Sequence, residues 1–140
     1  MTDRKQQVLI LCTHNSARSQ MAEALLNSLA SDRIDAHSAG SAPGGVNPFA
    51  IEAMSEIGID ISTARSKHLN EFLGGGIDIV ITVCDDANES CPVFPGNPQR
   101  IHWSFPDPSA VTGTYEERLA AFRAVRDGLR ERLEEWLAAS

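Results

Sequence analysis

The sequence has few lysines, few aromatic residues and no long apolar run. Lysine occurs only at Lys5 and Lys67, and 19 acidic against 12 basic side chains give a formal charge of −7. This balance argues against nucleic acid as a partner, because binders of a phosphate backbone usually present a basic patch. The longest apolar stretches, such as residues 8–12, are far shorter than the ~20 residues that span a bilayer. No signal-peptide pattern opens the sequence, so we expect a cytoplasmic protein with no membrane partner.

Cysteine is also scarce, at three residues in 140. Cys12, Cys84 and Cys91 are an odd number in a chain expected to stay in a reducing compartment, which favours reactive or inert thiols over a structural disulfide framework. A chain of this length buries roughly 70% of its unfolded surface. One domain over residues 1–140 can therefore fold without disulfides or a structural metal, and no metal site is predicted.

The pattern of apolar residues predicts strands that alternate with helices. Runs rich in β-branched residues predict four strands, at 7–12, 34–39, 77–84 and 100–105. Apolar residues at helical spacing predict helices after residue 19, from Pro48 to Ile57, over 67–72, and near the end of the chain, where the stripe is Leu119, Phe122, Val125, Leu129, Leu133 and Trp136. This alternation favours a three-layer α/β/α fold around a four-stranded parallel sheet.

Three reactive side chains follow predicted strands. Cys12, Cys84 and Asp107 each come directly after a strand or within two residues of its end. Ligands of parallel sheets bind beyond the carboxyl ends of the strands. We therefore expect these three residues to meet in one site.

Cys12 and Arg18 flank a small polar loop that leads into a helix. Loop and helix N–H groups supply donors with a partial positive charge, and the Arg18 guanidinium matches two oxygens of a tetrahedral anion. A cysteine in such a setting is favoured as a thiolate. The bare spacing is a weak signal, since a buried Cys12 beside a surface Arg18 would produce it too.

Residues 12–19, Cys-Thr-His-Asn-Ser-Ala-Arg-Ser, closely resemble the phosphate-binding loop of low-molecular-weight protein tyrosine phosphatases and of the arsenate reductases that share their fold. The likeness continues through residues 38–40, 58–62 and 107–108. It implies that Cys12 is the nucleophile, that Arg18 holds the oxyanion and that Asp107 is the general acid. The residues it assigns to substrate binding are Thr13, His14, Asn15, Ser16, Ala17, Arg18 and Ser19.

The second pair of cysteines separates a reductase from a phosphatase. Reduction of arsenate needs two electrons, which two thiols supply by forming a disulfide, whereas a phosphatase needs no further thiol. By resemblance to thioredoxin-coupled reductases, Cys84 attacks the Cys12–arsenic adduct and Cys91 resolves the resulting disulfide. The implied partners are arsenate, with phosphate or sulfate as competing anions, and thioredoxin or another thiol carrier. No bound cofactor is implied.

Two other functions stay open. One is a phosphatase for phosphotyrosine or another monoester, although Pro108 is followed by Ser109, Ala110 and Val111 rather than by aromatic residues that flank a phosphotyrosine ring. The other is a non-catalytic oxyanion-binding redox sensor. A zinc site formed by Cys84, Cys91 and His102 is disfavoured, because no C-x2-C spacing accompanies them.

Spacing constrains the Cys84 to Cys91 segment. Seven helical steps would hold the two Cα atoms about 10.5 Å apart, beyond the ~7 Å limit of a disulfide. The segment must loop or unwind when the disulfide forms. We hypothesise that oxidation remodels residues 84–92.

A set of polar residues is predicted to support the anion loop. Some similar reductases bind potassium through an Asn, a Glu, a Ser and an Asp, of which the first three match Asn15, Glu23 and Ser38. Lys67 stands at the aspartate position, and its ammonium can supply a built-in positive charge there. His14 departs from the commoner residues of the family, and its side chain either adds a donor or points to solvent.

Overall fold

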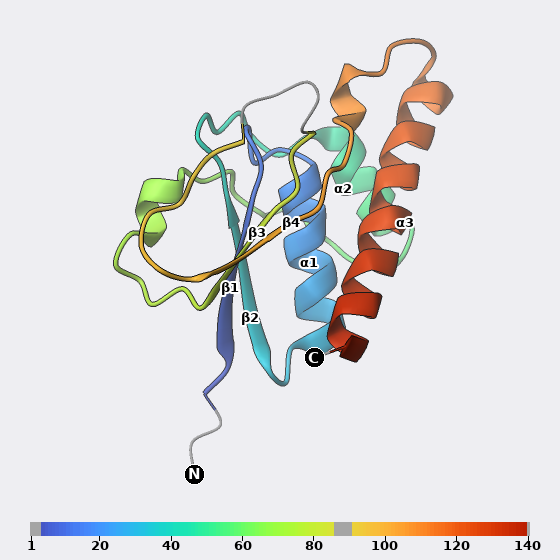
Figure 1. The fold of residues 1–140 in the computed structure, drawn as a ribbon. Coiled ribbons are helices and arrows are strands. Elements are labelled where there is room, and N and C mark those ends of the chain that lie inside the picture. The colour runs from blue at the N-terminus through green and yellow to red at the C-terminus, as the bar shows by residue number, and fades with distance from the viewer. Residues whose placement is uncertain (1–3, 86–90, 140) are drawn as a thin grey trace.

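The computed structural model describes residues 4–85 and 91–139, in which strands and helices alternate (Figure 1). The strands are β1 (Gln6–Leu11), β2 (Ile34–Ala39), β3 (Ile79–Thr82) and β4 (Gln99–His102). The α-helices are α1 (Arg18–Ala30), α2 (Pro48–Ser55) and α3 (Tyr115–Ala139), and two short 3-10 helices are η1 (Leu69–Phe72) and η2 (Pro108–Ala110). No helix in this part of the chain is both long enough and apolar enough to cross a membrane.

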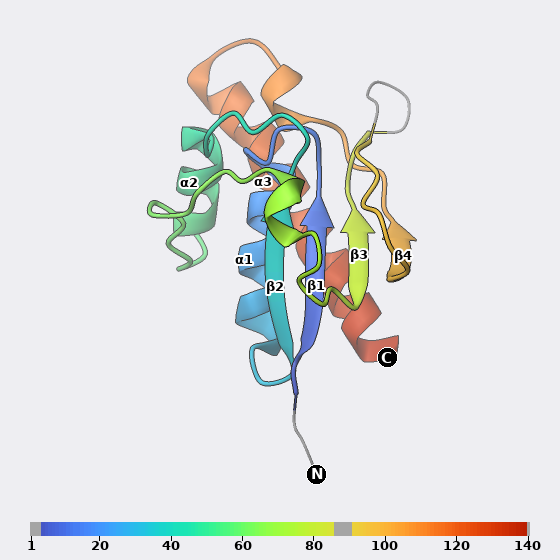
Figure 2. The same cartoon turned by 90° about the vertical axis from the view of Figure 1, so that its left-hand side faces the viewer.

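The four strands form one parallel sheet in the order β2-β1-β3-β4 (Figure 2). This confirms the predicted four-stranded parallel sheet. β1 lies at the centre because its apolar residues are buried on both faces, and β4 forms an edge. Parallel pairing places the carboxyl ends of all four strands at one end of the sheet.

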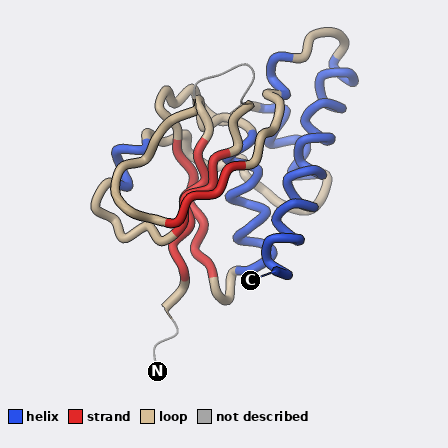
Figure 3. The backbone as a smooth tube through the Cα atoms, in the orientation of Figure 1, coloured by secondary structure: helices blue, strands red, loops and turns tan. Residues whose placement is uncertain are grey.

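The two faces of the sheet are covered differently. All three α-helices lie on one face (Figures 1 and 3), where they pack on Val8, Ile10 and Ile81. The opposite face, which carries Leu9, Leu11 and Val80, is covered by η1 and the loop that contains Phe94. The third layer of the predicted fold is therefore built from a 3-10 helix and a loop.

Helix α3 packs on the other helices through the stripe predicted from the sequence. Leu119, Phe122, Val125, Leu129 and Leu133 are buried, and Trp136 is half-buried beside Trp103. Trp103 and Phe105 pack against the same core. The burial of this stripe is the main contact that holds α3 to α1 and α2.

Some predicted element ends are wrong. β3 has four residues instead of eight, and β4 begins at Gln99 and ends at His102 instead of reaching Phe105. Beyond His102, the Trp103 N–H still donates to the Thr82 carbonyl, and the Phe105 carbonyl then accepts from the Arg18 side chain of α1. Asp107 consequently lies five residues after β4, not within two as predicted.

The predicted helix from Pro48 to Ile57 is also shorter, since α2 ends at Ser55. Its start is confirmed: the Asn47 side chain accepts from the Phe49 N–H, and Pro48 is the first helical residue. Gly58 has a φ of +81°, in the left-handed region that ends helices. The short helix predicted over 67–72 is the 3-10 helix η1.

Candidate active site

A loop with inward-facing donors joins β1 to α1. Cys12 is the first residue after β1, and no side chain caps α1 at Ala17. The backbone N–H groups of Asn15, Ser16 and Ala17 make no hydrogen bond to any other described residue. Together with the first turn of α1 they form a cradle of donors that suits an oxyanion.

A buried network of polar side chains holds this loop. The Cys12 sulfur lies 2.9 Å from Ser19 Oγ, and Asn15 Nδ2 donates to the same oxygen at 2.8 Å. Asn15 has a φ of 49°, which asparagine adopts more readily than most residues. Asn15 and Ser19 are fully buried, so these bonds have no water to compete with.

Gln20 completes the network, and sequence reasoning missed it. Its side chain lies off the apolar stripe of α1, so the pattern gives no signal of burial, yet only 1% of the residue is exposed. Gln20 Nε2 donates to Asn15 Oδ1 at 2.9 Å and to the Arg65 carbonyl at 2.9 Å. It therefore ties the anion loop to the segment that precedes η1.

Gly40 allows the loop to pass close to the end of β2. A Cβ atom at Gly40 would lie 2.5 Å from the Thr13 carbonyl oxygen and 2.7 Å from that of Cys12. These are backbone atoms that cannot rotate away. Glycine at this position lets residues 12–15 pack directly against the sheet.

Arg18 connects the loop to Asp107. Only 3% of Arg18 is exposed, and its Nη1 donates to the Phe105 carbonyl at 3.1 Å while Nη2 lies 3.9 Å from Asp107 Oδ2. The Asp107 carboxylate also accepts from the N–H and hydroxyl of Ser109, which fixes it at the start of η2. Two of the predicted site residues, Arg18 and Asp107, are thus held side by side.

The other two cysteines form a disulfide near Cys12. Leu11 pairs with Thr82 across β1 and β3, so Cys84 lies about one residue beyond the level of Cys12 on the neighbouring strand. Cys84 and Cys91 are joined, with Cα atoms 5.6 Å apart, and Cys12 is free and buried. A helix over this segment would hold the Cα atoms about 10.5 Å apart, so the joined state agrees with the predicted loop. Residues 86–90, where the remodelling is predicted, lie outside the described residues.

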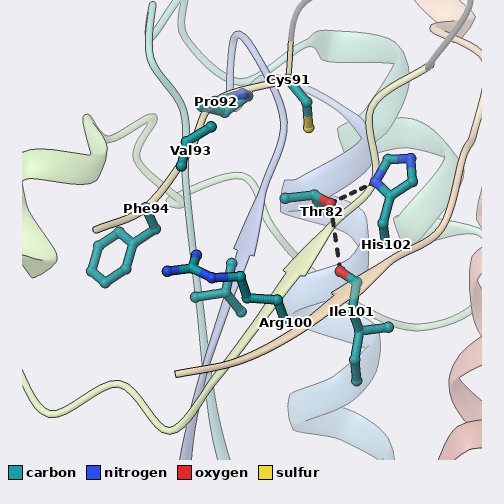
Figure 4. Close-up of a pocket in the computed structure, with 9 residues that line it drawn as sticks. Thr82, Cys91, Pro92, Val93, Phe94, Arg100, Ile101 and His102 are labelled. Atoms are coloured by element: carbon teal, nitrogen blue, oxygen red, sulfur yellow. Dashed lines mark hydrogen bonds between the residues drawn. The ribbon is translucent and has the colours of Figure 1, made fainter. Parts of the chain in front are cut away.

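The two sulfur atoms of the disulfide differ in access. Cys84 is fully buried, whereas Cys91 is half-buried and lines a pocket of about 280 Å³ beside β4. Figure 4 shows Cys91, Pro92 and Val93 along one side of this pocket and Arg100, Ile101 and His102 of β4 along another. An external molecule can approach Cys91 from this pocket.

Lys67 occupies an acidic position behind the loop. Its Nζ lies 3.6 Å from Glu23 Oε1, and the Ser38 hydroxyl donates to the same carboxylate oxygen at 2.6 Å. The Asn15 side-chain oxygen already accepts two hydrogen bonds, from Gln20 and from the Lys67 N–H at 2.8 Å. These residues do not fit a potassium ion, because the ammonium and the two donors already face the oxygens that would bind it.

His14 and His102 form hydrogen bonds with neighbouring segments of the fold. His14 is exposed, and its Nδ1 lies 3.1 Å from the Ala42 carbonyl oxygen, so it bonds to the neighbouring loop. His102 bonds through Nδ1 to Thr82 Oγ1 at 2.6 Å. No group of three or more potential metal-ligating residues occurs within the described residues.

Comparison with known proteins supports the resemblance. Residues 7–140 match the family model described as low molecular weight phosphotyrosine protein phosphatase. An arsenate reductase of Halalkalibacterium halodurans is 46% identical over 129 residues, which cover 92% of this chain and 93% of the relative.

Solved structures agree with the sequence relatives. An arsenate reductase of Archaeoglobus fulgidus has a TM-score of 0.79 at 28% identity, over 94% of this chain and 98% of that one. A thioredoxin-dependent arsenate reductase of Corynebacterium glutamicum has a TM-score of 0.68 at 29% identity, over 100% of this chain and 66% of the other.

Proposed function

Because the chain belongs to the low molecular weight phosphotyrosine protein phosphatase family, and within it to the arsenate reductases, we propose that it reduces arsenate to arsenite through Cys12, Cys84 and Cys91. The observation that carries this proposal is the combination of a free Cys12 under an anion loop with a Cys84–Cys91 disulfide at the next strand end. A phosphatase needs the loop alone.

Arsenate binds to the N–H groups and side chains of residues 13–19, with the Arg18 guanidinium on two of its oxygens. The Cys12 thiolate attacks arsenic, and one oxygen leaves as water after taking a proton from Asp107. The product is a Cys12–arsenic adduct in which arsenic is still pentavalent. Asp107 suits this role because it lies beside Arg18 and is partly open to solvent.

Electrons then pass from sulfur to arsenic. The Cys84 thiolate attacks the Cys12 sulfur, the electron pair of the sulfur–arsenic bond moves to arsenic, and arsenite leaves with two more electrons than arsenate. Cys91 next attacks Cys84 in the Cys12–Cys84 disulfide and releases the Cys12 thiolate. The Cys84–Cys91 disulfide is the end product of these steps. The segment of residues 84–92 is remodelled as the disulfide forms.

A dithiol carrier such as thioredoxin returns the enzyme to its starting state. Its thiolate attacks Cys91, the half-buried sulfur, and Cys84 leaves as a thiolate that a buried position shields from competing reactions. The carrier supplies both electrons and becomes a disulfide itself. Three working thiols require a reducing compartment, so the protein acts in the cytoplasm.

Lys67 supports the loop with its own charge, without potassium. Its ammonium balances Glu23, which accepts from Ser38, while its backbone N–H holds Asn15. A covalently attached cation cannot dissociate, so the loop keeps its geometry at any potassium concentration.

The decisive assay mixes the protein with arsenate, thioredoxin, thioredoxin reductase and NADPH, and follows the loss of NADPH. We expect consumption that depends on arsenate. Cys84→Ser should abolish reduction and leave hydrolysis of an aryl phosphate intact, whereas Cys12→Ser should abolish both. Mass spectrometry after turnover should find Cys84 joined to Cys91.

Other results would assign other functions. Aryl phosphate hydrolysis without arsenate-dependent NADPH loss would make the protein a phosphatase. Anion binding with no turnover of either substrate would make it a redox sensor. Arsenite formation with Cys84 and Cys91 still unlinked would contradict the three-thiol sequence.

A further inference from the structure

Gln20 is a buried amide with contacts on both sides of the anion loop. Its Nε2 lies 2.9 Å from Asn15 Oδ1, 3.3 Å from the Asn15 carbonyl oxygen and 2.9 Å from the Arg65 carbonyl oxygen. All three partners are acceptors, and only 1% of the residue is exposed. The Gln20 nitrogen is therefore the donor in each of these contacts.

Backbone groups fix the orientation of both amides. The Arg65 carbonyl can only accept, so the atom that faces it must be the Gln20 nitrogen. The Lys67 N–H can only donate, at 2.8 Å, so the atom that faces it must be the Asn15 oxygen. The Asn15 nitrogen is then turned toward Ser19.

The orientation of Asn15 sets the direction of the hydrogen bond between Ser19 and Cys12. Asn15 Nδ2 donates to Ser19 Oγ at 2.8 Å, so Ser19 accepts there and keeps its own proton to give. The Cys12 sulfur lies 2.9 Å from the same oxygen. A thiolate can only accept, so Ser19 donates to it, and the bond is charge-assisted.

We propose that Gln20 is a positioning residue for Cys12: its amide and the Lys67 N–H together hold the Asn15 side chain in place, and Asn15 in turn leaves the Ser19 hydroxyl proton directed at the Cys12 sulfur. The Arg65–Lys67 segment is the fixed anchor of this chain of donors. The inference rests on Cys12 being the nucleophile of the proposed function, and it adds a residue that never touches the anion.

The test titrates the Cys12 thiolate by its ultraviolet absorbance, with Cys12→Ser protein as the blank. The Cys84–Cys91 disulfide is kept intact, so that Cys12 is the one remaining thiol. Gln20→Met removes the donor with little change in volume and should raise the titration midpoint by about 0.5–1 pH unit. Gln20→Asn, whose amide is one methylene too short, should raise it less.

Asn27 supplies the matched control. It lies on the same helix and also joins its amide to backbone, donating to the Ala36 carbonyl at 3.0 Å and accepting from the Ala36 N–H at 2.9 Å. Asn27→Leu should lower the melting temperature and leave the midpoint at the wild-type value. A shift in Asn27→Leu as large as in Gln20→Met would mean a general loosening of α1 and would overturn the inference.

A measurement on the wild-type chain covers the case in which Gln20→Met does not fold. Ionisation of Cys12 should move the side-chain amide resonances of Gln20 in NMR spectra and leave those of Asn27 in place. Static Gln20 resonances, or a folded Gln20→Met protein with the wild-type midpoint, would overturn the proposal. Neither measurement needs arsenate, so failure here is distinct from failure of arsenate reduction.

Discussion

The Cys12 loop and the Cys91 segment lie at the same end of the sheet and are held in opposite ways. Around Cys12, the polar residues Asn15, Arg18, Ser19 and Gln20 are all at most 3% exposed and bonded to one another or to backbone. Around Cys91, Val93 is 81% exposed and a pocket opens beside the edge strand β4.

This difference matches two kinds of chemistry. An anion must meet donors that are already in place, because reorganisation during the reaction would raise its barrier. Disulfide exchange requires a sulfur atom that a second protein can approach in line. Under the proposed function, the buried network therefore serves the anion step, and the exposed segment serves exchange with the carrier.

The largest effect is expected at Gly40, where a substitution tests whether the anion step depends on the fixed position of the Cys12 loop. Gly40→Ala pushes its Cβ against the carbonyl oxygens of Thr13 and Cys12, so the loop must shift. A shift of about 1 Å costs on the order of 100-fold in rate. We expect kcat/KM for arsenate to fall by about that factor, and competition by inorganic phosphate to weaken in parallel.

Gly44→Ala is the control for this substitution. Among the residues that the structure describes, a Cβ at Gly44 would meet the Cβ of His14 alone, at 4.0 Å, which is an ordinary contact. Activity close to wild type is expected there. Reduction of the Cys84–Cys91 disulfide by thioredoxin should be unchanged in both variants, and a parallel loss would show that the two segments are not independent.

A charge at Val93 tests the exposed segment. Val93→Asp places a carboxylate at the rim of the pocket that Cys91 lines. A carboxylate at this position loses its hydration when a docked carrier covers the pocket, and a charge buried without a partner is costly. We therefore expect the KM for thioredoxin to rise by about tenfold, while competition by phosphate stays unchanged.

Leu73→Asp provides the comparison, since Leu73 is also an exposed apolar residue, at 47%, but does not line that pocket. Its KM for thioredoxin should match that of the wild type. An equal effect from Leu73→Asp would point to a non-specific role of surface charge.

Sequence reasoning found the residues whose chemistry is visible in a one-dimensional pattern. Cys12 and Arg18 flank a polar loop between a strand and a helix, and the two later thiols follow a strand of β-branched residues. The parallel sheet follows from strands that alternate with helices. Each of these signals is local and uses a known spacing.

No local spacing marks the burial of Gln20, and the family likeness covers Gly40 without giving the reason for a glycine there. The burial of Gln20 depends on Arg65, 45 residues away, and the need for glycine at position 40 arises from backbone contacts with Thr13 and Cys12. The predicted ends of β3 and β4 were wrong for the same reason. The edge strand β4 stops where the chain turns to meet Arg18, and this contact is not visible in the local sequence. Long-range packing decides these features.

Lys67 contacts both Glu23 and Asn15, and substitutions there are expected to have a smaller effect than those above. Wild-type activity should be equal in potassium chloride and sodium chloride, because the Lys67 ammonium already lies 3.6 Å from Glu23. Lys67→Asp replaces the cation with a carboxylate ligand and should make activity depend on potassium. Lys67→Met removes the charge without adding a ligand, so the activity of this variant should be the same in potassium chloride and in sodium chloride. Several-fold stimulation of the wild type by potassium would contradict this role.

The smallest effect concerns the ion pairs between Glu56, at the C-terminal end of α2, and two arginines of α3. Hydrogen bonds from Arg123, and with smaller effect from Arg126, lower the pKa of Glu56 from 4.5 to about 2, which ties α2 to α3. Since the folded-state pKa is depressed, this stabilisation is present above pH 4.5 and is lost as the pH falls toward 2. Glu56→Gln should lower the melting temperature at neutral pH by a few degrees and flatten its fall in acid, while Glu131→Gln changes neither. Because Glu56 caps the C-terminal end of α2, whereas the anion loop meets the N-terminal end through the Asn47 N–H, the titration of Cys12 and the KM for thioredoxin should stay at wild-type values. A change in either would show that the scaffold itself couples the anion loop to the exchange segment.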